Sequence, residues 1–403
     1  MRHRVLSPPW GENPLPAPIC LPPLAAESFL FSVDQLFAQA LTTKIFSGAS
    51  LLVAGPDLIL FHQTWGKTHD GGSAIDRHTL FDLASLTKPL ITAPLCMRAV
   101  AEGKLGLDDS LRSCFPSAPM TPTTRAITIR QLLSHSSGLP AYEPFYRELI
   151  SLEPSRRQEA LLGRLLRSPL LSRPGTASCY SDLGFMLLAM ILESVYDAPL
   201  DRLTALSLLQ EFDGTLRFCP LNVATDPTSR PERLTAIPGT FAATECCPWR
   251  KRLLVGEVHD ENAYCLGGQA GHAGLFGTAH GVFRLLSRLW NAHRGSTKDP
   301  SWPTEVVREF WTRHSAVPEG TWLLGFDTPS PPHSSAGSHF SPGSAGHLGF
   351  TGTSFWLDLD QEILIILLTN RVYPTRENER MKSFRPLVHN LVMETCLANT
   401  SCQ

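Results

Sequence analysis

The 403-residue sequence has no apolar run long enough to cross a membrane. Its longest apolar runs, residues 183–192 and 363–368, fall well short of the roughly 20 residues that a membrane-spanning helix needs. We interpret them as a core helix and a core strand. The first 28 residues begin with basic side chains but lack the apolar middle section of a secretory signal, so we expect a cytoplasmic protein.

The sequence also lacks an excess of charge of one sign. Its 35 Lys and Arg residues nearly balance its 37 Asp and Glu residues and form no basic stripe, which argues against a nucleic-acid partner. The ten cysteines are spread along the chain and include no C-x-x-C pair. We therefore expect mainly buried free thiols rather than a disulfide framework or a cysteine-bound metal.

The first quarter of the chain contains the pattern of a helix, a hairpin and a second helix. A proline-rich leader at 1–26 precedes a run at 27–41 with apolar residues at helical spacing. Two strand-like runs follow at 48–54 and 57–65, joined by a Gly-Pro turn. Another helix is predicted over 85–102, where a glycine ends it.

The last third of the chain returns to strands. A helix is predicted near 280–293, two strands over 346–358 and 362–369, and a closing helix over 377–397. Between them, residues 327–345 are rich in Pro, Ser and Gly, and a loop of that length indicates a mobile lid or a disordered insertion.

These patterns predict an α/β (α+β) fold in which strands from both ends of the sequence form one antiparallel sheet flanked by helices. Residues 27–104 and 267–403 would form this sheet domain. Residues 105–266, which are mostly helical in pattern, would form an inserted, mainly α-helical domain.

A serine and a lysine three residues apart, Ser85 and Lys88 in FDLASLTKP, form the first candidate catalytic group. Residues at this spacing share a helix face, so Oγ and Nζ can approach within hydrogen-bonding distance. Serine is a poor nucleophile until a base takes its proton. Burial lowers the pKa of a lysine, so a buried Lys88 could act as that base.

Two later segments supply possible partners. Tyr180 and Asp182 lie at the start of a predicted helix, where the phenol could relay protons to Ser85 and the carboxylate could bond Lys88 or cap the helix. The glycine-rich strand GHLGFTG, residues 346–352, would let a substrate approach closely and could offer backbone N–H groups to an oxyanion.

In this order, S-x-x-K, Y-S-D and H-x-G resemble the active-site motifs of the serine β-lactamase and penicillin-binding-protein superfamily. The tyrosine resembles the class C branch, which includes related esterases and D-amino-acid-releasing peptidases. The segments GKLGLDDS and IRQLLSHSSGLP also match that branch. The resemblance covers about residues 33–397 and implies a β-lactamase/transpeptidase-like fold.

The resemblance implies a role for each matched residue. Ser85 would be the acylated nucleophile, and Lys88 and Tyr180 would share its activation. The backbone N–H groups of Ser85 and Phe350 would form the oxyanion hole, with Gly349 beside them in the substrate site. Which member of the lysine and tyrosine pair is the base stays open.

Two departures from the family pattern affect the substrate and the base. His347 stands where many β-lactamases carry a lysine that helps to hold a substrate carboxylate, and histidine is mostly neutral at pH 7. This favours an esterase or peptidase over an efficient β-lactamase. Asp182 replaces the commoner asparagine, favours a charged Lys88, and thereby assigns more of the base role to Tyr180.

A fourth segment, residues 243–279, resembles a subgroup of serine hydrolases and low-molecular-mass penicillin-binding proteins. Its His, Asp and Glu residues match no established zinc spacing, so we expect no metal there. We expect Glu257, His259 and Asp260 to lie near the mouth of the substrate site.

Together these features predict a serine hydrolase that acts on a small ester, amide or lactam through an acyl-enzyme on Ser85, without a cofactor. A D,D-carboxypeptidase or penicillin-binding protein is one alternative, although it would have to meet peptidoglycan outside the cytoplasm. A non-catalytic binding or scaffold protein that retains the fold is the other. The sequence does not indicate an oligomeric state.

Overall fold

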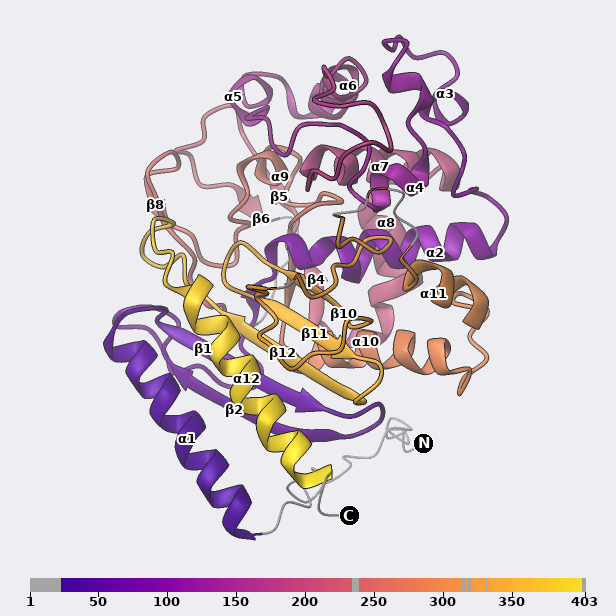
Figure 1. Ribbon diagram of the computed structural model, residues 1–403. Helices are drawn as coiled ribbons and strands as arrows, with labels where there is room; N and C mark the ends of the chain where they lie inside the picture. Colours follow the sequence, from indigo (N-terminus) through magenta and orange to yellow (C-terminus); the bar gives the residue numbers. More distant parts are fainter. Residues whose placement is uncertain (1–22, 234–238, 314–316, 318–319, 331, 401–403) are drawn as a thin grey trace, which may run out of the picture.

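The computed structural model describes residues 23–233, 239–313, 317, 320–330 and 332–400 (Figure 1). Most of the predicted leader, residues 1–22, lies outside the described residues. Helix α1 (Pro23–Thr42) begins four residues before the predicted start of the first helix. No helix in the described part of the chain is long and apolar enough to cross a membrane.

A five-stranded antiparallel sheet forms the centre of the lower half of the molecule (Figure 1). Its order is β10-β11-β12-β1-β2, so β1, from the start of the chain, pairs directly with β12, from its end. The strands are β1 (Gly48–Ala54), β2 (Ile59–Gly66), β10 (Ala345–Leu348), β11 (Ser354–Asp358) and β12 (Ile363–Thr369). The predicted mixed fold with an antiparallel sheet is confirmed.

The two central strands are buried on both faces. Successive side chains of a strand point to opposite faces. In β1, Leu51 and Val53 pack into one hydrophobic core, whereas Leu52 and Ala54 pack into the other. Strand β12 alternates in the same way, which explains why its sequence, ILIILLT, is a continuous apolar run.

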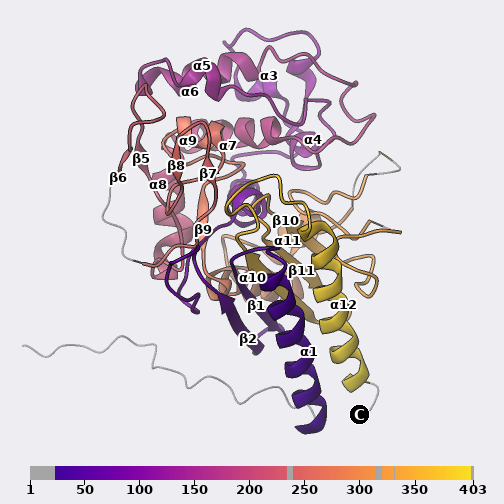
Figure 2. The ribbon, with the colours of Figure 1, turned by 90° about the vertical axis from the view of Figure 1, so that its left-hand side faces the viewer.

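Helices cover both faces of the sheet. Helices α1 and α12 (Met381–Thr400) contact each other on one face, where Figure 2 shows them running side by side. Helix α10 (Ala279–Arg294) packs on β1 and β12 from the other face. The predicted helices at 280–293 and 377–397 correspond to α10 and α12.

The prediction of one strand over 346–358 is wrong, because this segment forms a hairpin of two strands. Strands β10 and β11 pair with each other, and residues 349–353 form the turn between them. Gly352 in this turn has a φ of 105°, which side chains rarely adopt. The turn contains no proline and carries the β-favouring residues Phe350, Thr351 and Thr353, which is why the sequence suggests one strand.

The middle of the chain is largely helical and lies above the sheet in Figures 1 and 2. Its helices are α3 (Leu111–Cys114), α4 (Ile129–Leu133), α5 (Tyr146–Leu149), α6 (Pro154–Leu165), α7 (Asp182–Tyr196), α8 (Leu200–Thr204) and α9 (Glu261–Cys265). Short strands accompany them: β4 (Leu216–Phe218), β5 (Leu221–Asn222), β6 (Glu232–Arg233), β7 (Cys246–Cys247) and β8 (Arg252–Leu253).

The two halves of the molecule are joined through a small second sheet. Its order is β3-β9-β4, with β3 (Phe81–Asp82) and β9 (Leu275–Gly277) from outside the predicted insertion and β4 from within it. The predicted domain boundaries at residues 104 and 266 stay a prediction.

The segment predicted as a lid or disordered insertion, residues 327–345, packs against α12 over much of its described length. Ala336 and Phe340 are buried in the core beneath α12. The N–H of Ser338 donates to Asn390 Oδ1 at 2.8 Å. These contacts give the segment a fixed path beside the helix.

The eight described cysteines are not in disulfide bonds. Four of these eight are buried, three are half-buried and Cys246 is exposed, so the expectation of mainly buried thiols is met only in part.

Candidate active site

Ser85 lies in a tight turn directly after strand β3. The turn begins at Ala84, whose φ of 48° is unusual for a residue with a side chain. It continues as a 3₁₀ helix (Ala84–Leu86), a π-helix (Lys88–Thr92) and α2 (Ala93–Ala101). The predicted helix over 85–102 therefore exists but starts irregularly, and both strained backbone and π-helical turns are frequent at functional sites.

Lys88 is fully buried, and each of the three N–H bonds of its ammonium group has an acceptor. Nζ lies 3.0 Å from Ser85 Oγ, 2.6 Å from Asp182 Oδ1 and 3.1 Å from the carbonyl oxygen of His272. The sequence predicts the first two contacts. The third is made by a backbone carbonyl, which no side-chain motif indicates.

Lys88 is not the neutral amine that burial alone would favour. Burial lowers the pKa of Lys88, but the Asp182 carboxylate, a Tyr180 phenolate whenever one forms, and the hydrogen bonds to both residues outweigh burial, so the pKa is raised. Burial raises the pKa of Tyr180, and Lys88 offsets only part of this effect. In the resting site Lys88 is therefore an ammonium ion and Tyr180 a neutral phenol.

Helix α7 and the loop before it position Tyr180 and Asp182. Ser181 caps the helix through its hydroxyl oxygen, which accepts from the N–H of Gly184. The N–H of Ser181 donates to His135 Nδ1 at 3.0 Å. The Tyr180 ring packs on the His135 ring, at 4.7 Å between centroids, and Lys88 Nζ lies 4.8 Å from the Tyr180 ring centre.

The turn between β10 and β11 is tied to the serine turn by two threonines. Thr351 Oγ1 donates to the carbonyl oxygen of Asp82 at 2.7 Å, and Thr353 Oγ1 donates to that of Leu83 at 3.1 Å. Gly349 allows this approach, because a Cβ there would lie 2.7 Å from the Leu83 oxygen.

This turn brings the predicted oxyanion-hole residues to one cavity. Ser85 and Phe350 both line it, and neither backbone N–H donates to another group in the described part of the chain. Two unengaged amides beside a nucleophile are the arrangement that stabilises an oxyanion.

His347 lies on strand β10 and is buried beside Tyr180 and Trp322, with ring centroids 6.0 and 5.7 Å away. Its Nδ1 lies 2.8 Å from the Leu348 carbonyl oxygen. Burial, assisted by the charge of Lys88, lowers the pKa of His347 to about 3. His347 is therefore neutral at pH 7, unlike the lysine that it replaces.

The structure separates the three residues predicted near the mouth of the site. His259 and Asp260 line the cavity, and the N–H of His259 donates to Asp82 Oδ2 at 2.7 Å. Glu257 instead pairs with Arg250 and Arg252, each at 2.8 Å, and is buried away from the cavity wall. Sequence adjacency alone cannot distinguish them, because the chain turns between residues 257 and 259.

The cavity measures about 710 Å³ and is large enough for a small acyl substrate. Of the predicted site residues, the wall includes Ser85, Tyr180, Asp182, His259, Asp260, His347, Gly349 and Phe350. It also includes residues that the sequence did not single out for this site, among them Tyr142, Trp322, Asp327, Arg371, Arg376, Lys382 and Arg385. These residues belong to none of the family motifs quoted above, so only their position in the fold reveals them.

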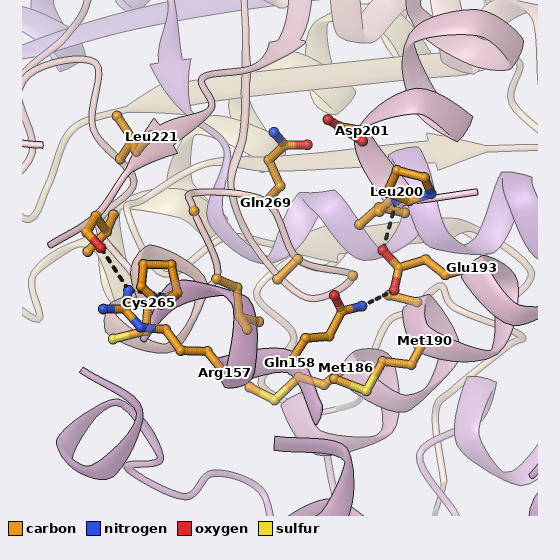
Figure 3. A pocket seen from close by; sticks show the side chains of 18 of the residues that line it. Arg157, Gln158, Met186, Met190, Glu193, Leu200, Asp201, Leu221, Cys265 and Gln269 are labelled. Atoms are coloured by element: carbon orange, nitrogen blue, oxygen red, sulfur yellow. Dashed lines mark hydrogen bonds between the residues drawn. The ribbon is translucent and has the colours of Figure 1, made fainter. Parts of the chain in front are cut away.

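A second cavity, of about 280 Å³, lies among α6, α7 and α8 (Figure 3). Gln158 and Glu193 are hydrogen-bonded across one side of it, and Gln269 points in from another segment. Gly271 also lines this cavity, and its carbonyl oxygen accepts from Thr92 Oγ1 at 2.6 Å. The segment around Gly271 thus separates the second cavity from Lys88.

Comparisons with known proteins identify relatives over most of the chain. "N-acetylmuramyl-L-alanine amidase" of Bacillus subtilis (strain 168) is 31% identical over 370 residues, which are 85% of this chain and 81% of the relative. "Putative D-alanyl-D-alanine carboxypeptidase" of Escherichia coli (strain K12) is 31% identical over 374 residues, which are 85% and 82% of the two chains.

Solved structures share the fold at low sequence identity. EstCE1, described as "a hydrolase with promiscuous acyltransferase activity", has a TM-score of 0.64 at 22% identity, and the match covers 90% of this chain and 100% of EstCE1. The octameric penicillin-binding protein homologue from Pyrococcus abyssi has a TM-score of 0.64 at 18% identity. The match covers 89% of this chain and 77% of the homologue. The Beta-lactamase family model matches residues 33–389, so the chain belongs to the β-lactamase family of serine hydrolases.

Proposed function

We propose that the protein hydrolyses a small acyl substrate through an acyl-enzyme on Ser85. The contact of Ser85 Oγ with the buried Lys88 ammonium, at 3.0 Å, in the same cavity as Tyr180 and the two unengaged amides, is the observation that carries this proposal. A lysine buried with an ion-pair partner beside a serine is costly to maintain without a chemical use.

In the proposed reaction, the Tyr180 phenolate takes the proton of Ser85 while Ser85 Oγ bonds to the substrate carbonyl carbon. The carbonyl oxygen becomes an oxyanion held by the Ser85 and Phe350 N–H groups. Tyr180 then gives the proton to the leaving group as its bond to carbon breaks. Water then attacks the acyl carbon while Tyr180 takes a proton from it. Tyr180 returns this proton to Ser85 Oγ as the bond between Ser85 and the acyl group breaks, and the acid is released.

We assign the base role to Tyr180 because Lys88 has no free electron pair in the resting site. Each of its three N–H bonds has an acceptor, and the Asp182 carboxylate stabilises the ammonium charge. The Lys88 ammonium would stabilise the phenolate of Tyr180, whose ring centre lies 4.8 Å away.

The substrate class that we favour is an ester or amide rather than a β-lactam antibiotic. The neutral His347 cannot replace the permanent cation that helps to hold a lactam carboxylate. A D,D-carboxypeptidase or a muramyl amidase is the second candidate, supported by the names of the two relatives. The cytoplasmic location expected from the sequence stays a prediction.

The test is the intact mass of the protein after exposure to a fluorophosphonate, followed by peptide mapping. We expect one adduct on Ser85, none in Ser85→Ala, and no protection by excess penicillin. Protection by penicillin would favour the carboxypeptidase candidate. No adduct at all would contradict the proposed mechanism and favour a binding protein that retains the fold.

A further inference from the structure

His135 follows helix α4 in a backbone conformation that ordinarily belongs to glycine. The Ser136 N–H donates to the Gln131 carbonyl oxygen at 2.9 Å. The His135 N–H donates to the Leu132 carbonyl oxygen at 3.3 Å, and together these two bonds are the Schellman pattern of a helix C-terminus. His135 occupies the left-handed position of this pattern, with a φ of 53°. A residue with a side chain is less stable there than glycine.

The imidazole of His135 is also unfavourably placed for a residue that only ends a helix. The residue is 1% exposed, and burial, assisted by the charge of Lys88, lowers its pKa well below the usual range, so the ring is neutral. Nδ1 accepts the N–H of Ser181 at 3.0 Å, so the ring proton lies on Nε2. Among the described residues Nε2 has no acceptor, and a buried unpaired donor is unfavourable. A histidine at this position therefore needs an explanation other than the helix end.

The contacts of His135 with the segment that carries the catalytic phenol supply this explanation. The His135 carbonyl oxygen accepts the N–H of Cys179 at 2.9 Å, and Nδ1 accepts that of Ser181. Between these two bonds, the Tyr180 ring packs on the imidazole with 4.7 Å between the ring centroids. His135 therefore holds the residues on both sides of Tyr180 as well as the phenol ring itself.

Two further aromatic rings enclose the imidazole. The centroid of Trp322 lies 4.4 Å from that of His135 and 5.3 Å from that of Tyr180. Phe185 of α7 lies 5.1 Å from His135 by the same measure. The imidazole fills the space between these rings and the phenol, so a smaller side chain at position 135 would leave Tyr180 room to move.

A small movement of Tyr180 would affect the proposed proton transfer. Lys88 Nζ lies 4.8 Å from the Tyr180 ring centre and 3.0 Å from Ser85 Oγ. The phenolate must lie within hydrogen-bonding distance of the serine hydroxyl to take its proton, and a misplacement of about 1 Å can lower a rate about 10²-fold. The Lys88 ammonium also stabilises the phenolate less as the two groups separate.

We propose that His135 is a positioning residue, which holds Tyr180 in place for proton transfer from Ser85 through the Ser181 bond at Nδ1 and the contact between the two rings. This inference rests on the proposed function and on its assignment of Tyr180 as the base. His135 is not among the residues that line the catalytic cavity, so it acts on the reaction only through Tyr180.

The test is a double-mutant cycle on the rate at which a fluorophosphonate labels Ser85, followed by intact mass at one fixed pH. The cycle compares the wild type, His135→Gly, Tyr180→Phe and the double variant. Glycine suits the left-handed backbone and removes only the imidazole, so it would replace without loss a residue needed only to end α4. We expect His135→Gly to lower the labelling rate about tenfold or more when Tyr180 is present, and less than about threefold in the Tyr180→Phe background.

His135→Asn separates the two contacts and takes the place of glycine in the cycle if the glycine variant does not fold. Asparagine tolerates the left-handed backbone, and its Oδ1 can accept the Ser181 N–H, but it lacks the ring. We expect labelling faster than in His135→Gly and slower than in the wild type. An asparagine variant no faster than the glycine variant would overturn the role of the Ser181 bond.

Asp197→Gly is the matched control. Asp197 ends α7 with a φ of 48°, at the opposite end of that helix from Tyr180, so the substitution makes the same backbone change away from the phenol. The control should label at the wild-type rate. Circular dichroism checks that each variant is folded.

The remaining outcomes separate this inference from the proposed function. Equal losses for His135→Gly with and without the Tyr180 hydroxyl would overturn the inference and leave the hydrolase intact, because the loss would then be general. Wild-type labelling by both His135 variants would also overturn it. Wild-type labelling by Tyr180→Phe would overturn the base assignment and this inference together. No adduct on Ser85 in the wild type would overturn the proposed function itself.

Discussion

At the scale of single residues, the charge of Lys88 depends on Asp182 rather than on burial. A fully buried lysine would ordinarily lose its proton more easily. The carboxylate 2.6 Å from Nζ reverses that tendency and raises the pKa. An asparagine at position 182 would keep a hydrogen bond but not the charge. In the proposed mechanism, the aspartate therefore leaves Tyr180 rather than Lys88 as the base.

The first prediction concerns the pH dependence of acylation. A Tyr180 base with a raised pKa is almost entirely protonated at pH 7, so its phenolate increases about tenfold per pH unit. We expect the single-turnover acylation rate with p-nitrophenyl acetate to rise by about that factor per unit from pH 7 to 9. Tyr180→Phe should lose roughly 10²-fold or more in rate, together with this slope. A flat wild-type profile would rule out Tyr180 as the base.

The second prediction concerns Asp182→Asn. Without the carboxylate, burial should lower the folded-state pKa of Lys88 below its unfolded value, so the unfolded chain binds more protons. Stability then rises with pH between these two values. We expect the Tm of the variant to lie furthest below the wild-type Tm near pH 6.5 and to approach it toward pH 10. We also expect the rise of the acylation rate with pH to occur at lower pH in the variant than in the wild type. A deficit independent of pH would show that the ion pair does not control Lys88.

At the scale of elements, the site depends on how closely the β10–β11 turn approaches the serine turn. The two threonine hydrogen bonds fix this distance, and Gly349 makes it possible. The sequence motif places a glycine here, but it does not say what the glycine lies against. The structure identifies that neighbour as the Leu83 carbonyl of the strand before Ser85.

The third prediction tests that contact. In Gly349→Ala the new Cβ would overlap the Leu83 oxygen and Thr353 Oγ1, so the turn must move and carry the Phe350 N–H with it. We expect acylation to fall about 10²-fold, the usual effect of losing one oxyanion donor. Gly343→Ala is the control, because its Cβ would point into open space. Equal activity of the two variants would show that the Phe350 amide is not part of the oxyanion hole.

At the scale of the whole molecule, the two ends of the chain close the fold together. Strand β1 pairs with β12, and α1 packs against α12 over the outer face of the sheet. Phe384 of α12 contacts both Phe37 and Phe46, with ring centroids 5.4 and 5.3 Å away. The core beneath these helices therefore depends on residues from opposite ends of the sequence.

The fourth prediction follows from this closure. Phe384→Ala should lower the free energy of unfolding by about 3–5 kcal/mol, the usual cost of removing a buried phenylalanine side chain. Chemical denaturation checks this value. Leu387→Ala, on the same helix but 56% exposed, is the control and should change stability much less. Similar losses in both variants would contradict the central role of this aromatic contact.

The sequence by itself determined the sheet built from both ends of the chain and identified Ser85, Lys88 and Tyr180, which the fold brings together. These follow from local periodicity and short motifs, which depend on neighbouring residues. The tertiary structure alone decided the raised pKa of Lys88, the separation of Glu257 from the cavity that Asp260 lines, and the close approach of Gly349 to the Leu83 carbonyl. Each depends on burial and on distances between groups far apart in the chain, which local patterns do not encode.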